Sequence, residues 1–144
     1  MILNRQNRIR INQAVLARFE ARLRRALRLG RRGMTICFVD DREMARLNRA
    51  FRGKPKPTDV LSFPANGTGN SGLARGESRN YLGDIAISPQ TARKNAVRFE
   101  RTLDNELRVL MLHGALHLMG HDHESDHGEM ERKENRLRRK LRLG

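Results

Sequence analysis

The sequence predicts one α+β or α/β domain, spanning residues 1–144, in which a small sheet packs with helices. Three short β-rich runs alternate with segments of helical periodicity, in the order αβαβ followed by βααα. The chain has no internal repeat and no linker long enough to divide it, and 144 residues suit a single domain. A chain of this length buries roughly 68–70% of its unfolded surface, so its core needs no disulfide.

The first predicted helix spans residues 12–29. Apolar residues recur along it at helical spacing, and arginines occupy most of the remaining positions. Gly30 is the expected C-cap, because glycine readily adopts the left-handed conformation that ends many helices. The apolar stripe consists of Val15, Leu16, Phe19, Leu23, Ala26 and Leu27.

A strand at residues 34–40 and a helix at residues 41–51 come next. The strand MTICFVD contains the chain's single cysteine, Cys37, which we interpret as a core residue and not as a nucleophile. The helix is expected to end at Gly53. Three of its residues are expected to face the core: Met44, Leu47 and Phe51.

The middle of the chain combines a connector, a strand and a loop. The prolines of KPKP, residues 54–57, prevent a helix there and indicate an extended, basic connector. A strand is predicted at residues 59–65, with Pro64 indicating a sheet edge or the strand's end. Residues 66–80 are rich in Gly, Ser and Asn but have no Walker pattern, so they predict a surface loop and not a phosphate cradle.

The C-terminal half predicts one strand and three helices. The strand covers residues 81–88, and Pro89 suits the first turn of a helix at 89–100. Residues 103–119 are apolar almost all round, which is typical of a central, buried helix. Residues 126–142 predict a last amphipathic helix with a very basic outer face.

The net charge of +14 lies entirely on the two terminal segments. Residues 1–32 contain ten Arg and one acidic residue, and residues 130–144 contain seven Lys or Arg and two acidic residues, whereas residues 33–129 contain 13 of each sign. Such segments suit a polyanion such as RNA; the alternative is two solvated helix faces. The candidate RNA-contacting residues are Arg18, Arg22, Arg25, Arg28, Arg136, Arg138, Arg139 and Lys140.

The cellular setting expected from the sequence is the reducing cytoplasm. The N-terminus MILNRQNRIRINQ has no apolar region of the kind found in signal peptides. No apolar run approaches the roughly 18 residues of a membrane span, so we expect no membrane association. A single cysteine excludes an intrachain disulfide.

The segment HGALHLMGHDH, residues 113–123, carries a metal-site pattern. His113 and His117 share one face of the buried helix because they are four residues apart, Gly120 ends that helix, and the chain can then return His123 to the same point. Three imidazoles with a fourth position left open are typical of a catalytic zinc site. Histidines at this spacing also occur as packing residues, but buried imidazoles without partners are costly, and a metal removes that cost.

Several polar residues around the third histidine are candidate helpers. His121 is interpreted as a pocket-wall or supporting residue and His127 as a helix-terminus residue. The acidic residues of the turn can orient the histidines or activate water. They are Asp122, Glu124 and Asp126.

Three motifs in order resemble the YbeY family of bacterial endoribonucleases. They are HGALHLMGHDH, FRGKPKPTDVLSFP at residues 51–64 and YLGDIAIS at residues 81–88, whereas the first 33 residues carry no matching motif. The resemblance implies a four-stranded mixed sheet packed with about five helices. It also implies one zinc ion per chain, bound by His113, His117 and His123, and a functional role for Arg52.

The biological role implied by the resemblance is single-strand-specific cleavage of ribosomal RNA. Members of the family are implicated in maturation of the 3′ end of 16S ribosomal RNA and in ribosome quality control, so the implied partners are single-stranded ribosomal RNA and the small ribosomal subunit. We expect the protein to act as a monomer.

The spacing also matches the metzincin peptidases in every position but one, where Gly114 replaces the Glu that serves as general base. Losing general-base help typically costs 10²–10⁴ in rate. RNA cleavage depends more on cations near the phosphate, which zinc and Arg52 would supply, with Asp122 or His121 handling the proton. The nucleophile is either a metal-activated water or the substrate's 2′-hydroxyl. A metzincin-like zinc peptidase and a non-catalytic RNA-binding ribosome assembly factor are the alternative functions.

Overall fold

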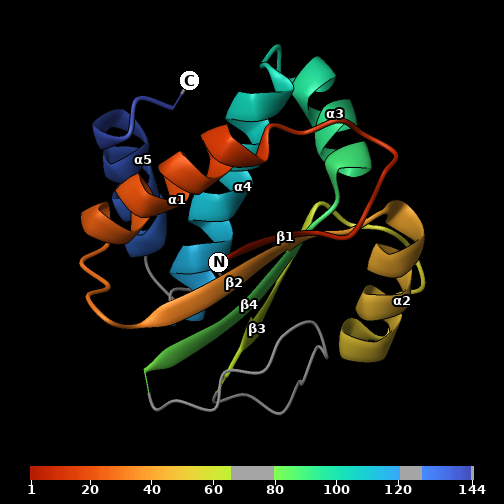
Figure 1. Ribbon diagram of the computed structural model, residues 1–144, viewed down its shortest axis with the longest axis horizontal. Coiled ribbons are helices and arrows are strands. Elements are labelled where there is room, and N and C mark those ends of the chain that lie inside the picture. Colours follow the sequence, from red (N-terminus) through yellow and green to blue (C-terminus); the bar gives the residue numbers. More distant parts are fainter. Residues whose placement is uncertain (66–79, 121–127, 144) are drawn as a thin grey trace.

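The computed structural model describes residues 1–65, 80–120 and 128–143. Within these ranges the chain forms five helices and four strands, whose arrangement can be followed in Figure 1. In chain order they are β1 (Ile2–Asn4), α1 (Gln13–Ala26), β2 (Gly33–Phe38), α2 (Asp41–Arg52), β3 (Val60–Pro64), β4 (Tyr81–Ile87), α3 (Pro89–Arg98), α4 (Leu103–Leu118) and α5 (Glu129–Lys140).

The four strands form one mixed sheet in the order β1-β2-β4-β3. β1 pairs with β2 and β2 with β4 in parallel, whereas β3 pairs with β4 antiparallel. β3 is therefore an edge strand, in agreement with the position of Pro64 at its end. The predicted α+β class is confirmed. The sequence pattern missed β1, because three residues are too short to show an alternation of apolar and polar positions.

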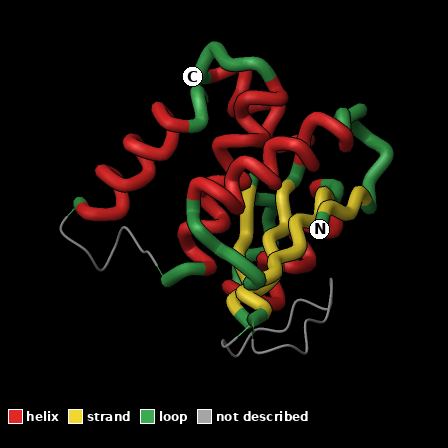
Figure 2. Tube along the Cα trace, turned by 60° about the vertical axis from the view of Figure 1, so that its left-hand side comes forward, coloured by secondary structure: helices red, strands yellow, loops and turns green. Residues whose placement is uncertain are grey.

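Helices cover both faces of the sheet, but unequally. α1, α3, α4 and α5 pack on one face, and α2 lies on the other (Figure 1). Successive strand residues serve opposite faces, so Ile85 belongs to the core beneath the four helices and Ala86 to the smaller core beneath α2. Figure 2 shows the strands side by side, with most of the helices above them. Cys37 is fully buried in the smaller core, and burial raises the pKa of its thiol to about 11, which agrees with a packing role.

The central helix α4 is the element that positions the site. Thr102 caps its first turn through a hydrogen bond from the backbone N–H of Asn105 to the threonine Oγ1, 3.1 Å long. Ten of its sixteen residues are buried, so the expectation of a central, buried helix is confirmed. A helix enclosed in this way holds its side chains in fixed directions, which a binding site requires.

Three helices are followed by a residue other than glycine in the left-handed conformation. The first of them, α1, ends earlier than predicted. α1 ends at Ala26 and not at residue 29, because Arg28 adopts the left-handed conformation with a φ of 54°. The N–H of Leu29 then donates to the carbonyl of Arg24, and the Leu29 side chain is buried. This is a Schellman motif in which burial of the following leucine compensates for a residue other than glycine. Glu100 and Arg142 end α3 and α5 with the same backbone conformation.

Candidate active site

His113 and His117 project from the same face of α4, as their spacing predicts. Their Nε2 atoms lie 3.1 Å apart, and their rings meet edge to face with centroids 4.6 Å apart. Both residues are partly exposed, unlike most of α4. Two imidazole nitrogens that face one another across so short a distance can share a proton or bind one cation between them.

Glu134 of α5 contacts the ring nitrogen of His113 that faces away from His117. Its Oε1 lies 3.3 Å from Nδ1 of His113, and its side chain is 13% exposed. A carboxylate in this place accepts the Nδ1–H, which leaves the lone pair of Nε2 facing His117. The sequence pattern did not indicate a role for Glu134. This residue lies 21 residues from His113, in a segment whose one evident feature is its positive charge.

The two histidines fit a zinc site. Tetrahedral zinc with Zn–N bonds of about 2.0–2.1 Å holds its ligand nitrogens about 3.3 Å apart, close to the separation of the two Nε2 atoms. A carboxylate on the second nitrogen of a ligand histidine is also a common feature of zinc sites. The third predicted ligand, His123, and the predicted helper Asp122 lie outside the described residues. So do the other candidates of the turn: His121, Glu124, Asp126 and His127.

Gly114, which stands where a metzincin has its general base, faces the sheet. A Cβ atom at this position would lie 2.7 Å from Cγ2 of Ile85, a distance that side chains do not adopt. The Oγ of Ser62 also donates to the Gly114 carbonyl, 3.0 Å away, and so joins β3 to α4. The absence of a side chain lets the helix approach β4, and a glutamate here could not point towards the histidines.

The histidines open onto a cleft of about 500 Å³ at the β3 edge of the sheet. Arg52, in the last turn of α2, lies on the wall of the same cleft. Within the described ranges its guanidinium forms neither an ion pair nor a hydrogen bond, so it is available to an anionic ligand. The cleft is lined by Phe51, Arg52, Thr58, Asp59, Val60, Leu61, Ser62, Pro64, His113 and His117.

Phe51 corrects a prediction, because it lines the cleft and does not face the core. Its side chain is 42% exposed and meets the ring of Phe63 edge to face, with centroids 4.7 Å apart. Helical spacing alone could not reveal this, because it shows which residues share a face of α2 but not which of them the sheet covers; Met44 and Leu47 belong to the smaller core and Phe51 does not. An exposed aromatic ring on a cleft wall offers a stacking surface to a flat ligand.

Asp59 is a second cleft residue that sequence reasoning missed. Its Oδ2 accepts a hydrogen bond from Nδ2 of Asn95, 3.0 Å away, and its Oδ1 one from Thr58 Oγ1 at 3.5 Å. The carboxylate therefore lies on the cleft in a fixed orientation, with lone pairs left for further donors. A carboxylate held in this way is suited to receive a proton from a ligand in the cleft.

Comparisons with known proteins cover nearly the whole chain. The family model described as "Endoribonuclease YbeY" matches residues 1–142, so the match includes both terminal segments, where no motif was visible. No described helix is long and apolar enough to cross a membrane.

Two curated relatives cover nearly the whole chain. A protein of Koribacter versatilis (strain Ellin345) is 44% identical over 99% of this chain and 86% of its own length, and one of Pelotomaculum thermopropionicum is 36% identical over 100% and 94%. Both bear the name endoribonuclease YbeY. The solution structure of TM1509 from Thermotoga maritima matches 98% of this chain and 89% of its own, with 27% identity and a TM-score of 0.65.

Proposed function

The chain belongs to the YbeY family of endoribonucleases, and from this premise we propose that it cuts single-stranded ribosomal RNA with one zinc ion held by His113, His117 and His123. The enzyme is a hydrolase that acts on RNA. The observation that carries the zinc proposal is the convergence of two Nε2 atoms at 3.1 Å, with Glu134 behind one of them, on the cleft that also contains Arg52.

Arg52 and Glu134 have different roles in the proposed reaction. Cleavage of a phosphodiester gathers negative charge on the phosphoryl oxygens, and Arg52 binds these oxygens through its fork of N–H donors. Glu134 keeps a proton on Nδ1 of His113, which keeps Nε2 available as a ligand. A bound zinc ion would supply Lewis-acid charge and lower the pKa of water.

The proton of the nucleophile requires an acceptor. Asp122 is the acceptor that the sequence suggests, and Asp59 is a further candidate because its carboxylate lies on the cleft beside Arg52. The nucleophile is a water molecule or the substrate's 2′-hydroxyl. Single-stranded RNA is the substrate we propose because an unpaired strand can enter a cleft of this size with its bases splayed, whereas a stacked duplex cannot.

The proposed setting is maturation of the 3′ end of 16S ribosomal RNA and quality control of ribosomes in the cytoplasm, with the small ribosomal subunit as partner and the protein as a monomer. The peptidase alternative is disfavoured because Gly114 faces Ile85, where no general base could reach the histidines. Family membership favours an enzyme over a non-catalytic assembly factor.

The test is cleavage of end-labelled RNA by wild type and a His117→Ala variant purified identically. We expect wild type to cut a single-stranded RNA, to leave the same sequence intact in a duplex, and to leave casein intact. The variant should lose the activity. Equal cleavage by both preparations would reveal a contaminating nuclease and remove the basis of the proposal, and release of peptides from casein would restore the peptidase alternative.

A further inference from the structure

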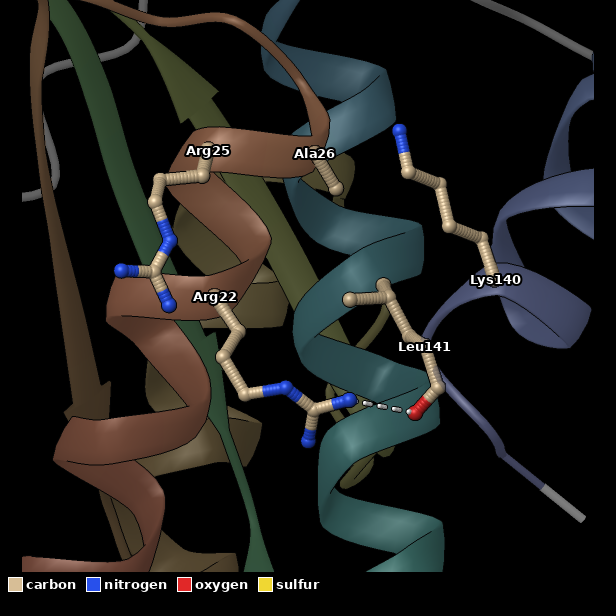
Figure 3. Close-up of a pocket in the computed structure, with 5 residues that line it drawn as sticks. All are labelled: Arg22, Arg25, Ala26, Lys140 and Leu141. Atoms are coloured by element: carbon tan, nitrogen blue, oxygen red, sulfur yellow. Dashed lines mark hydrogen bonds between the residues drawn. The ribbon is translucent and has the colours of Figure 1, made fainter.

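The two basic terminal segments meet in the folded chain. α1 and α5 lie next to one another on α4 (Figure 1), and Nη2 of Arg22 donates to the carbonyl of Leu141, 3.0 Å away and 119 residues further along the chain. Between the two helices is a cavity of about 250 Å³, which we call the α1–α5 pocket (Figure 3). Its walls consist of Arg22, Arg25, Ala26, Lys140 and Leu141.

The three cations of the α1–α5 pocket have no anionic partner among the described residues. Glu20, the one acidic residue of α1, pairs instead with the N-terminal amine at 2.9 Å. Arg22 directs one N–H to Leu141, and Lys140 extends along the gap towards the end of α1 (Figure 3). Cations that line a concave site without a counter-charge produce a positive potential that attracts an anion.

The ends of the two helices do not neutralise this charge. Arg25 lies in the last turn of α1, and Lys140 is the last residue of α5, so both lie where the helix dipole favours a cation. Each helix C-terminus is equivalent to about −0.5 of an elementary charge, so the two together offset roughly one of the three cations. An excess of positive charge remains in the pocket.

α4 adds a further cation near this pocket. The guanidinium carbons of Arg22 and Arg108 lie 6.0 Å and 5.9 Å from the centroid of the same Phe19 ring. Phe19 is 2% exposed, so the ring anchors both side chains against the core. The anchoring limits the conformational freedom of Arg22 before any ligand binds, which favours tight binding.

α5 connects the α1–α5 pocket to the active-site cleft. Its Glu134 contacts His113, and Lys140, six residues later, lines the pocket. Six residues of helix span about 9 Å. A single RNA strand whose scissile bond lies in the cleft would reach the pocket by passing along α5.

We propose that the α1–α5 pocket binds a backbone phosphate of the RNA strand that the cleft cuts. This inference rests on the proposed function, which identifies the bound strand as RNA. The pocket contributes affinity and no chemistry, because Arg and Lys at ordinary exposure bind phosphate as charges and N–H donors. Phosphate contacts carry no sequence information, so the pocket would hold RNA of any sequence.

The test is a salt titration with charge reversals at the pocket and at a matched control site. The pocket variant is Arg22→Glu/Arg25→Glu/Lys140→Glu, with a milder Arg25→Glu/Lys140→Glu variant that keeps the Arg22–Leu141 hydrogen bond. The control reverses Arg93, Lys94 and Arg98, exposed residues of α3 that are also two arginines and one lysine. The probe is a fluorescent 2′-O-methyl RNA longer than the cleft, checked by gel for integrity.

For single strands the slope of log K against log salt changes by about 0.7 per phosphate contact. Because the pocket binds one phosphate, we expect the triple variant and the milder variant each to flatten the slope by about 0.7, and the control to leave it within about 0.3 of wild type. Equal slopes in wild type and both pocket variants, or an equal change in the control, would overturn the inference and leave the basic helices as solvated faces.

Cleavage of an RNA of a few nucleotides, too short to reach the pocket, separates the two proposals. The pocket variants should cut it at the wild-type rate and should lose rate on long RNA only below saturation, through a higher KM. A lost rate on the short RNA would overturn the affinity role of the pocket. Absence of cleavage in wild type itself would count against the proposed function, whereas the salt slopes would still report on the pocket.

Discussion

The active-site cleft and the α1–α5 pocket differ in the chemistry that their side chains offer. The cleft is lined by two histidines, a carboxylate and an arginine, which are side chains suited to a metal, a proton and a phosphate, and these residues come from the electrically neutral middle of the chain. The charged residues of the pocket are all cations, and they come from the two basic terminal segments. The side chains that line the cleft and those that line the pocket therefore come from different parts of the sequence, and we expect substitutions at one to leave the other intact.

The two regions nevertheless share their supports. α4 carries the histidines and also packs against α1, and α5 contacts His113 at one turn and lines the pocket at another. The separation is one of function, not of structure. We expect a substitution of an exposed side chain to affect only the region in which it lies. A substitution at a buried contact of α4 should affect both regions.

The largest expected effect comes from removing a zinc ligand. His113→Ala or His123→Ala should lose the bound zinc, lower the melting temperature because metal binding couples to folding, and reduce RNA cleavage more than about 100-fold, since even outer partners of metal ligands contribute 10–100-fold. The salt slope of RNA binding should stay at its wild-type value. Metal analysis and thermal denaturation check the prediction. Full zinc occupancy in His123→Ala would contradict the assigned ligand set.

Substitution of Glu134 should have the next largest effect, on zinc affinity, although its side chain contacts His113 and not the substrate. Glu134→Gln should weaken zinc affinity about 10–100-fold, because the neutral amide holds the Nδ1–H of His113 less strongly. Competition with a zinc chelator measures the change. Glu131→Gln, at an exposed position on the same helix, is the matched control and should leave the affinity unchanged. Equal affinities in wild type and Glu134→Gln would make the carboxylate a packing partner only.

Arg52 tests whether the cleft supplies its own phosphate contact. Arg52→Ala should reduce cleavage about tenfold or more, because a cation near the phosphoryl oxygens is lost, and should leave zinc content and melting temperature unchanged. Arg52→Lys should recover only part of the rate, since a bidentate fork becomes a point charge. Arg49→Ala, in the same last turn, is the control. Parallel loss of stability and activity would assign Arg52 to the fold.

Gly114 should have the smallest effect on cleavage and a clear effect on stability. Gly114→Ala should cost about 1–3 kcal/mol of unfolding free energy, because its Cβ meets Ile85 in a packed core, while the folded fraction keeps its rate. Chemical denaturation provides the measurement. In an Ile85→Ala background the same substitution should cost far less. A constant cost in both backgrounds would show that contact with Ile85 is not the reason for glycine.

Local patterns predicted the elements well. The apolar stripe of the first helix, the left-handed cap at Gly53 and the edge position of the strand ending at Pro64 are all present. These features depend on residues close in sequence, where periodicity and backbone preference decide the outcome. The alignment of His113 with His117 belongs to the same class, because a helix fixes the spacing of its own side chains.

Contacts between segments far apart in the sequence could not be predicted from the sequence pattern. Glu134 against His113, Asp59 on the cleft and Arg22 against Leu141 all depend on how helices and strands pack, which no local spacing encodes. Arg28 ended α1 before Gly30 because Leu29 could be buried, which is also a tertiary effect. The reason for Gly114 was likewise invisible until β4 was placed beneath it.

A zinc titration of metal-free protein tests whether cleavage requires one zinc ion bound by the histidines of the cleft. End-labelled single-stranded RNA would be incubated with protein stripped of metal and then given increasing zinc. We expect cleavage to rise in proportion to bound zinc and to level off at one ion per chain, and we expect His117→Ala neither to bind the ion at this stoichiometry nor to gain activity. Full cleavage by the metal-free protein, or equal recovery in His117→Ala, would contradict it.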